Sequence, residues 1–328
     1  MEFHAAFHPK KFKTKIQHNE SLFLIGSCFT EQIGNKFLQH KFQVLQNPNG
    51  ILFNPVSISH AITGYCNNSK TKEIALFYFN ELWHNWQHHS LYSGIDKKEV
   101  LEKINQSETQ AHVALSQADW LMITLGSAFV YENLESDAAG LERVVANCHK
   151  MPAQTFNRRL LAVDEIVEVL RLALTAVHTL NKNTKVIFTI SPVRHLREGF
   201  IENNRSKAAL IQAVHSLVNE EDILYFPAYE LIIDDLRDYR FYAEDMVHPN
   251  YVATNYVWEK LLETAVSGEA QAIMKEISVI NAAINHKPLN PTSAQHKKFI
   301  METLLKIEWL QNQHPHLHFT SEKERLIF

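Results

Sequence analysis

Four short apolar runs constrain the fold of this 328-residue chain more than any other feature of its sequence. They cover residues 22–25, 121–125, 186–190 and 223–226, and each consists mainly of Leu, Ile, Val or Phe. None alternates apolar with polar side chains, as a strand with one solvent-facing side would do. We therefore predict parallel strands that are covered by helices on both faces.

Segments with helical spacing of apolar residues separate or follow these runs. Residues 30–42, 155–180 and 206–218 carry apolar side chains three or four positions apart, which places them on one face of a helix. Alternating strands and helices are typical of an α/β sandwich. Residues 43–117 are less regular and contain Asn-Pro twice, so we predict a long excursion that shapes a surface over the sheet.

The C-terminal part of the chain has a purely helical pattern. We predict a helix after Pro249 that ends near residue 266, and two more at 269–285 and 293–311. This division predicts an α/β domain over residues 1–266 and a helical C-terminal extension over residues 267–328.

Composition excludes several classes of function. The 32 Lys and Arg residues face 36 Asp and Glu residues, with no block of like charge, so we expect no nucleic-acid partner. The usual Gly-rich nucleotide loops are absent among the 9 glycines, and we expect no cofactor. No apolar run reaches the roughly 18 residues of a membrane span. The N-terminus lacks the apolar core of a signal peptide, so we expect a soluble, cytoplasmic protein with no membrane partner.

Metal and disulfide chemistry have little support in the sequence. The chain has three cysteines, Cys28, Cys66 and Cys148. Their wide spacing and the absence of a CxxC pair argue against a disulfide framework and a structural zinc site. A histidine-rich stretch holds His84, His88 and His89, but aromatic residues interleave with them and no acidic ligand is near. We expect no metal site there.

The strongest local motif is FLIGSCFT at residues 23–30, in which an apolar strand runs into Gly26, Ser27 and Cys28 and a helix begins at once. A nucleophile on such a turn is held out of the sheet, and the helix N-terminus offers N–H groups to a developing anion. The same field would lower the pKa of a cysteine. The alternative is a helix cap followed by a buried thiol, and this segment alone leaves both interpretations open.

The second motif is DMVHP at residues 245–249, just before a predicted helix. A histidine is the natural general base near neutral pH, and Asp245 can accept the Nδ1 proton of His248 and hold its tautomer. An exposed capping Asp beside an incidental His is the alternative. The order favours catalysis, because the nucleophile motif comes early and Asp-x-x-His comes last in the α/β part.

Six motifs in order make the chain resemble a known family. They are GSCFT at 26–30, NPNGILFNP at 47–55, TLGSAFVY at 124–131, NCHKMP at 147–152, SPVRH at 191–195 and DMVHPN at 245–250. The chain resembles the GSCFA family, a branch of the SGNH or GDSL hydrolase-like superfamily. The resemblance implies a three-layer α/β/α, flavodoxin-like sandwich and an esterase-like or acyl-transfer site, without implying a substrate.

Two departures from the superfamily pattern concern the reacting groups. Most relatives read Gly-Asp-Ser in the first block, so the resemblance puts Cys28 at the nucleophile position and Ser27 at the usual Asp. Either of them remains a candidate nucleophile. The third block normally supplies an oxyanion-hole Asn, but Ala128 stands there, and losing one such donor costs roughly 100-fold to 1,000-fold in rate.

The resemblance also implies a set of binding residues around the predicted site. Gly50 matches the second-block glycine whose N–H is the other usual oxyanion donor, and Asn49, Asn147 and the Ser127 hydroxyl are candidates to replace the missing Asn. Gly126 lies where backbone approaches the reacting group. The remaining polar candidates for a substrate group are His149, Lys150, Arg194 and His195, and the alternative is that they cap helices.

Our first hypothesis is an SGNH-type hydrolase or acyltransferase acting on an ester, such as an acylated carbohydrate or metabolite. Cys28, or Ser27, attacks the carbonyl, His248 takes the proton and Asp245 orients it, while N–H groups of Cys28 and Gly50 hold the oxyanion. The second hypothesis is a binding or scaffold protein on a hydrolase fold. A metal-dependent enzyme is the third and weakest.

Overall fold

The computed structural model describes residues 5–219 and 221–327, and a five-stranded parallel sheet forms its centre. The strands are β1 (Ser21–Gly26), β2 (Gln43–Gln46), β5 (Trp120–Leu125), β9 (Lys185–Ile190) and β10 (Ile223–Phe226). Their order is β10-β9-β5-β1-β2, with all pairs parallel. The four predicted strands are confirmed, and the prediction missed β2, whose sequence QVLQ lies half-exposed at the sheet edge.

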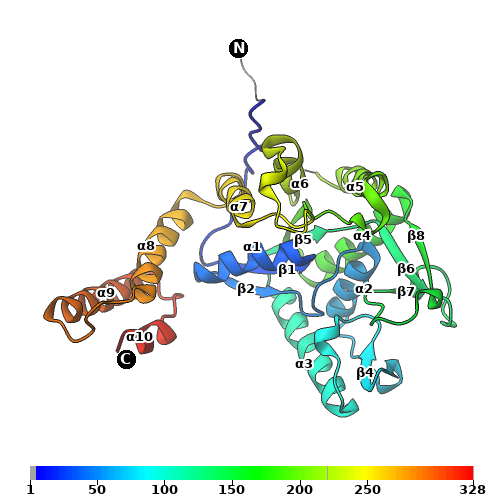
Figure 1. Cartoon of the computed structure of the whole chain (residues 1–328), viewed down its shortest axis with the longest axis horizontal. Helices are drawn as coiled ribbons and strands as arrows, with labels where there is room; N and C mark the ends of the chain where they lie inside the picture. The colour runs from blue at the N-terminus through cyan, green and yellow to red at the C-terminus, as the bar shows by residue number, and fades with distance from the viewer. Residues whose placement is uncertain (1–4, 220, 328) are drawn as a thin grey trace.

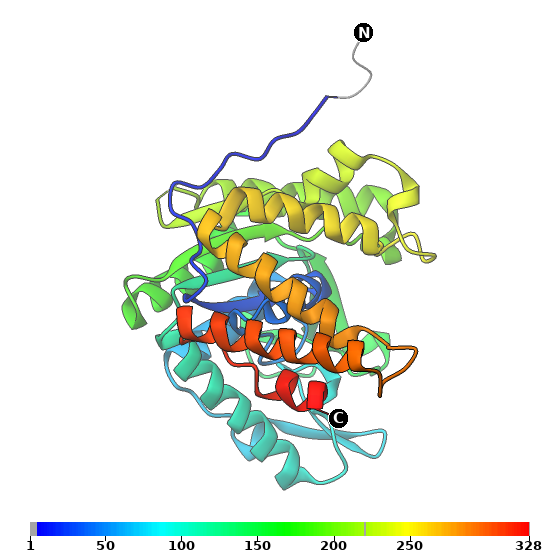
Figure 2. The same ribbon diagram turned by 90° about the vertical axis from the view of Figure 1, so that its left-hand side faces the viewer.

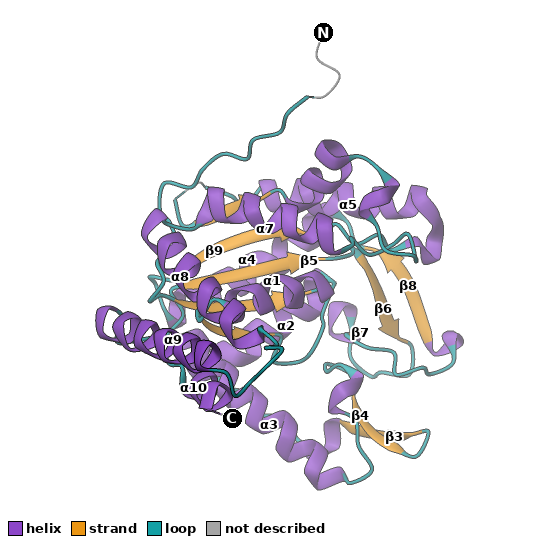
Figure 3. Cartoon of the chain, turned by 60° about the vertical axis from the view of Figure 1, so that its left-hand side comes forward, coloured by secondary structure: helices purple, strands orange, loops and turns teal. Residues whose placement is uncertain are grey.

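Helices cover both faces of the sheet, which confirms the three-layer α/β/α sandwich (Figure 1 and Figure 3). On one face lie α2 (Pro55–Cys66), α3 (Lys97–Ser116), α4 (Val163–Leu180) and α5 (Gly199–His215), and on the other lie α1 (Cys28–Gln39) and α7 (Tyr251–Ala265). Alternate side chains of each strand enter the two cores. In β1, Phe23 and Ile25 pack with α2 and α4, whereas Leu22 and Leu24 pack with α1 and α7. Burial on both faces explains the continuous apolar runs.

The prediction of one helix over residues 155–180 is wrong at its start. The segment begins with β8 (Phe156–Leu160), which pairs antiparallel with β6 (Phe129–Asn133), and β7 (Val144–Val145) lies on the other side of β6. The helix α4 starts only at Val163, where the Glu165 carboxylate accepts the N–H of Ala162 at 2.8 Å. The partner strand of β8 lies far away in the sequence, so local periodicity could not reveal it.

The excursion at residues 43–117 is more regular than predicted. Besides β2 it contains α2, the hairpin of β3 (Leu76–Phe79) and β4 (Leu82–Asn85), and the 20-residue helix α3. Asn54 caps α2 by accepting the N–H of Ser57 at 2.9 Å, with Pro55 as the first helical residue. The Asn-Pro dipeptide that we read as a loop signal is thus a helix start.

Several short helical segments connect the main elements. They are α6 (Ala228–Glu230), the π-helix Leu231–Leu236 and the 3₁₀ segments Glu73–Ala75, Ser90–Tyr92, Gly140–Arg143, Ala153–Thr155, Leu196–Glu198 and Tyr239–Phe241. The loop between the last of these and α7 carries the predicted Asp245 and His248.

The C-terminal helices α8 (Gly268–Asn285), α9 (Ala294–Gln313) and α10 (Thr320–Ile327) extend to one side of the sandwich (Figures 1 and 2). They share a core of their own, which includes Ile277, Ile307 and Phe319. We propose that this unit begins at residue 267, because Ser267 caps α8 by accepting the N–H of Ala270. Within the described part of the chain, no helix has both the length and the apolar character that a membrane span requires.

Candidate functional site

The strand order creates a switch point between β1 and β5. The chain leaves β1 toward β2 on one side, and later returns to add β5, β9 and β10 on the other. In open α/β sheets, ligands bind at the carboxyl ends of the strands where the order reverses. Gly26 at the end of β1 pairs with Thr124 near the end of β5, so the first and third predicted blocks meet there.

A tight turn carries the chain from β1 into α1. Gly26 has φ +148°, its N–H donates to Asn47 Oδ1 at 2.8 Å, and its carbonyl accepts the N–H of Leu52 at 3.0 Å. Ser27 follows as the N-cap, with its N–H on the Thr124 carbonyl at 3.2 Å. Cys28 is therefore the first residue of α1, at the positive end of the helix dipole.

Burial separates the two candidate nucleophiles. Ser27 is 2% exposed, and its Oγ is buried without a hydrogen-bond partner. Cys28 is partly exposed. Burial raises the pKa of the Cys28 thiol, while the N–H groups of Phe29 and Cys28 and the charge of Lys207 act in the opposite direction. Cys28 is thus partly open to solvent, whereas Ser27 Oγ is closed to it.

His248 and Asp245 form the expected pair. His248 Nδ1 lies 2.7 Å from Asp245 Oδ2, and Asp245 Oδ1 accepts the N–H groups of Val247 and His248 at 2.9 and 3.0 Å. These hydrogen bonds from His248 and Val247 lower the pKa of Asp245 to about 2, so its carboxylate is ionised and fixes the imidazole tautomer. Within residues 5–219 and 221–327, no hydrogen bond joins His248 to Ser27 or Cys28.

The SPVRH loop lies beside the His248 loop. Arg194 donates its N–H to the Val247 carbonyl at 3.1 Å, and its guanidinium stacks 4.2 Å from the centre of the Tyr242 ring. His195 Nε2 is buried without a partner, and burial, followed by the charges of Lys207 and His248, lowers the pKa of His195 to about 3. The His195 imidazole is therefore neutral, and its buried Nε2 lies beside Gly126.

The third-block loop is closed to the substrate by its own hydrogen bonds. The N–H groups of Gly126 and Ser127 donate to the Phe53 carbonyl at 2.8 and 2.9 Å, and that of Ala128 donates to Ser206 Oγ at 2.7 Å. Ser127 Oγ accepts the Phe129 N–H at 3.1 Å and lies 3.3 Å from Ser206 Oγ. A Cβ at Gly126 would lie 3.1 Å from His195 Nε2, so the absence of a side chain at this position leaves room for the imidazole.

The second-block residues are also engaged within the protein. Gly50 has φ +77° and donates its N–H to the Asn47 carbonyl at 2.7 Å. Asn49 accepts the Tyr65 hydroxyl at 2.6 Å and donates to the Gln87 carbonyl at 3.1 Å. The N–H of Gly50 is therefore taken, and so is one of the two Nδ2 hydrogens of Asn49. Both residues shape the loop that holds Gly26.

The NCHKMP residues lie elsewhere. Asn147 accepts the N–H of His149 at 2.8 Å, and the buried His149 contacts the Asn85 carbonyl through Nε2 at 2.8 Å. Lys150 is exposed. These contacts link the loop to the β3–β4 hairpin, whereas Arg194 and His195 contact the His248 loop, so the structure does not unite the two sets.

The histidine-rich stretch is built into the hairpin and the loop after it. His84 contacts Ser93 and the Phe79 carbonyl at 2.7 and 3.0 Å, His88 contacts Asn85 at 2.9 Å, and His89 accepts the Leu91 N–H at 3.3 Å. No group of three or more His, Cys, Asp or Glu side chains within the described ranges could hold a metal ion.

Sequence reasoning missed one buried residue at this edge of the sheet. Lys207 of α5 is 1% exposed and donates from Nζ to the carbonyls of Gly126 and Ser191 at 2.6 and 2.7 Å. A signal was present, since Lys207 shares its helix face with Leu210 and Val214, three and seven positions later.

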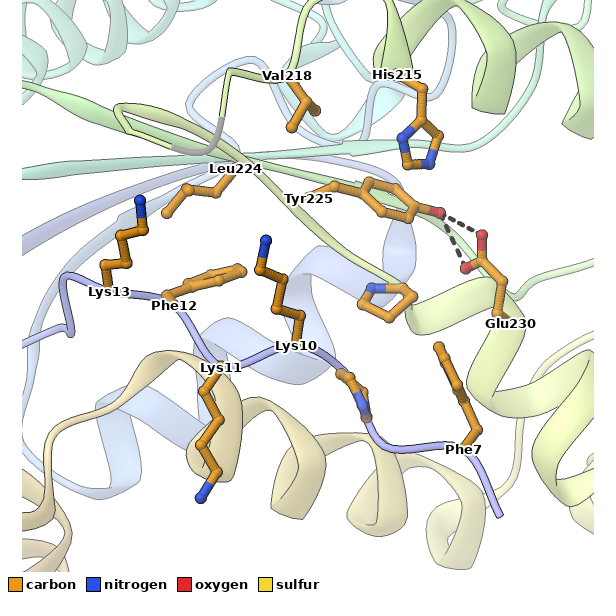
Figure 4. A pocket seen from close by; sticks show the side chains of 12 residues that line it. Phe7, Lys10, Lys11, Phe12, Lys13, His215, Val218, Leu224, Tyr225 and Glu230 are labelled. Carbon is orange, nitrogen blue, oxygen red and sulfur yellow. Dashed lines mark hydrogen bonds between the residues drawn. The ribbon is translucent and has the colours of Figure 1, made fainter. Parts of the chain in front are cut away.

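A separate cavity of about 370 Å³ lies against the N-terminal segment (Figure 4). Phe7, Phe12 and Leu224 supply apolar walls, and the Tyr225 hydroxyl donates to both Glu230 oxygens at 2.7 and 2.9 Å. Its lining includes none of the candidate catalytic residues.

Comparison with known proteins identifies the family. Residues 21–261 match the model of the GSCFA family, and residues 277–326 match that of the GSCFA domain protein, C-terminal domain. Among solved structures, the chain is similar to a carbohydrate esterase family 3 from Talaromyces cellulolyticus, with 10% identity, a TM-score of 0.38 and coverage of 79% of this chain and 99% of that one. It is also similar to an acetyl esterase mutant with acetate ion, with 11% identity, a TM-score of 0.36 and coverage of 80% and 99%. No curated protein matches. Since the first family model spans well over half of its length, the chain belongs to the GSCFA family.

Proposed function

We propose that this protein is an ester-cleaving enzyme, an acyl hydrolase or acyltransferase of the SGNH type, with Cys28 as nucleophile. One observation carries the proposal: of the two candidate nucleophilic residues on the β1–α1 turn, only Cys28 is partly exposed, and it begins a helix at the switch point of the sheet. Ser27 Oγ, the other candidate, is buried.

In the first half-reaction, the Cys28 thiolate attacks the ester carbonyl, the C–S bond forms and the alkoxide leaves. His248, held by Asp245 at 2.7 Å, takes the proton of the Cys28 thiol and gives it to the departing alkoxide. In the second half-reaction, His248 takes a proton from water or from an acceptor hydroxyl, which attacks the thioester and frees Cys28.

Two kinds of donor can hold the oxyanion. The first N–H groups of α1, those of Cys28 and Phe29, have no intrahelical acceptor because they begin the helix. His195 Nε2 is the second donor in the tautomer that carries its proton there, since the pKa of about 3 keeps the ring neutral and Nε2 has no protein partner. We propose that His195 replaces the absent third-block Asn, since the loop of Ala128 offers no free donor.

We further propose that the substrate is a polar ester, such as an acylated carbohydrate or metabolite. Support comes from Arg194, a partly exposed cation whose N–H donates to the Val247 carbonyl of the His248 loop, and which suits a hydroxyl or anionic oxygen of the alcohol portion.

Intact-mass spectrometry with p-nitrophenyl acetate tests the nucleophile. Wild type should gain one acetyl group, Ser27→Ala should gain it as well, and Cys28→Ala should not. An adduct that persists in Cys28→Ala, or no adduct in wild type at any pH between 6 and 9, would contradict the proposal.

The alternative is a binding protein on a hydrolase fold, and it has specific support: the third-block N–H groups are all engaged, and no hydrogen bond joins His248 to Cys28 in the described chain. Under this alternative, His248→Ala should leave ester turnover at the level of wild type, and Cys28 should react like an ordinary thiol.

A further inference from the structure

A cavity of about 210 Å³ lies among the elements of the 43–117 excursion, with walls from α2, the loop after it, the end of β4 and α3. Most of its lining side chains are polar, and they include Asn49 of the second block but neither Cys28 nor His248. Ser69 and Ala75 on its outer wall are exposed, so the cavity reaches the surface. Since one water occupies about 30 Å³, the space suits a small organic molecule.

Hydrogen bonds around His88 fix the position of its ring proton. Asn85 Oδ1 accepts the N–H of Gln87 at 2.8 Å, and it lies 2.9 Å from His88 Nδ1. The amide of Asn85 is oriented, because its Nδ2 donates to the Ala75 carbonyl at 3.3 Å. His88 Nδ1 must therefore donate to Asn85 Oδ1. Burial lowers the pKa of His88 to about 3, so at neutral pH the ring has no second proton and Nε2 carries a lone pair.

This lone pair faces a carboxylate across the cavity wall. His88 Nε2 lies 3.8 Å from Glu108 Oε1, and both residues line the cavity. His88 is only 2% exposed, and its Nε2 has no hydrogen-bond partner among the described residues. Glu108 accepts the N–H and the hydroxyl of Thr71 at 2.9 and 2.6 Å, but no lysine or arginine in the described chain forms an ion pair with it. Two acceptors in this arrangement require a donor between them.

A third lining residue adds another unused acceptor. Gln87 Nε2 donates to the Val144 carbonyl at 2.9 Å, which fixes the amide, and Gln87 Oε1 is buried without a partner. The unused groups are thus acceptors, and one of them belongs to a carboxylate, so a cation with several N–H groups complements them best. Hydrogen bonds of about 2.9 Å from one nitrogen reach both His88 Nε2 and Glu108 Oε1, because these atoms are less than twice that length apart.

We propose that this cavity binds a small polar primary amine, with its ammonium group between His88 Nε2 and Glu108 Oε1. An ammonium is compact and has three hydrogens, of which these two acceptors take one each. The polar side chains on the rest of the lining, such as His60 and Ser69, suit hydroxyl groups on the remainder of the ligand. This binding site is separate from ester cleavage and goes beyond the proposed function.

Gly64 offers a way to fill the cavity without changing its acceptors. It lines the cavity from within α2, and a Cβ added to it would have no atom within 4 Å. Gly64→Leu therefore places a side chain in the space that the ligand would occupy. Leucine also favours a helix more than glycine does, so this variant should fold.

Isothermal titration calorimetry with two amines, ethanolamine and glucosamine, tests the proposal. Ethylene glycol and glucose are the matched neutral probes, since each carries a hydroxyl where the amine carries its ammonium. At least one amine should bind with a Kd of about 1 mM or below, and its neutral counterpart should bind at least roughly tenfold more weakly. Glu108→Gln should weaken binding of the amine by roughly tenfold or more, and Gly64→Leu should abolish it. Glu102→Gln is the matched control, because it removes an exposed carboxylate from the same helix and should leave binding unchanged.

Three results would each overturn the proposal: no binding of either amine up to about 10 mM, equal binding of an amine and its neutral counterpart, or unchanged binding in Gly64→Leu. Urea unfolding verifies that each variant is folded. If Glu108→Gln does not fold, the neutral probes and Gly64→Leu still decide the outcome. The titrations require no turnover, so their result does not depend on Cys28 being a nucleophile.

Discussion

Replacing Gly26 by Ala should lower the stability of the protein more than the same replacement at any other glycine. A Cβ at this position would lie 2.2 Å from the Thr124 carbonyl oxygen and 2.9 Å from its carbonyl carbon. Both atoms belong to the backbone of the central strand β5, so no side chain can rotate to relieve the contact. In addition, φ +148° is a conformation that residues with a Cβ rarely adopt.

The magnitude follows from these contacts. The backbone conformation costs about 2 kcal/mol for a residue other than glycine. Moving β1 away from Thr124 also breaks the hydrogen bond from the Ser27 N–H to the Thr124 carbonyl, which leaves a buried donor unpaired at a cost of about 1–2 kcal/mol. The total loss of unfolding free energy is on the order of 4 kcal/mol, which is exceptionally large for a single substitution. The melting temperature should fall by roughly 10 °C.

Urea unfolding followed by circular dichroism measures the effect, with Gly64→Ala as the matched control. Gly64 lies inside α2 with no atom within 4 Å of its added Cβ and no positive φ, so alanine there should stabilise the helix by about 0.5–1 kcal/mol. A Gly26→Ala protein within about 1 kcal/mol of wild type would refute the argument that the Thr124 contact requires glycine.

Three further predictions test other parts of the structure. Asp245→Asn should lower kcat for an ester by on the order of 100-fold or more with little change in KM, because His248 loses the carboxylate that fixes its tautomer; equal turnover in steady-state assays would contradict this. Burial lowers the pKa of His88 to about 3 in the folded protein, whereas in the unfolded chain it is near 6.5. The folded state is therefore not penalised by His88 above pH 6.5, and it loses stability as the pH falls from 6.5 toward 3, because only the unfolded chain takes up the proton. At pH 5 the loss should be about 2 kcal/mol in urea titrations, and His88→Gln should flatten that slope. Asn54→Ala should cost about 1 kcal/mol by removing the cap of α2, and an unchanged urea midpoint would contradict it.

The parts of the fold that sequence alone predicted are those with a local signal. Strands β1, β5, β9 and β10 are apolar on both faces, so a single run of residues reveals each of them. Strand β8 reads FNRRL and is stabilised by pairing with β6 and by Arg158 over the Phe129 ring at 3.7 Å. That pairing joins residues 29 positions apart, such as Val130 and Arg159, which helical periodicity cannot detect.

The candidate site likewise contains some features that depend on neighbours in the sequence and others that depend on residues far away in it. The pairing of Asp245 with His248 is local, and the spacing of three residues together with the place of the motif at the end of the α/β part predicts it. The environment of Ser127 depends on Ser206, 79 positions away, which determines that its hydroxyl is engaged. The burial of Lys207 was not predicted, because a lysine in a polar stretch of helix normally faces water. Only its spacing from Leu210 indicates that it lies on the buried face.

Helix α5 connects the two loops of the site through three side chains on one face. Asn203 accepts the His195 N–H at 2.9 Å, Ser206 accepts the Ala128 N–H, and Lys207 binds the Gly126 and Ser191 carbonyls. The three lie at positions i, i+3 and i+4, which gives a linear pattern, Asn-x-x-Ser-Lys. Any relative that carries this pattern should tie the same two loops to one helix, so the pattern can be sought in the sequences of family members before any of them is purified.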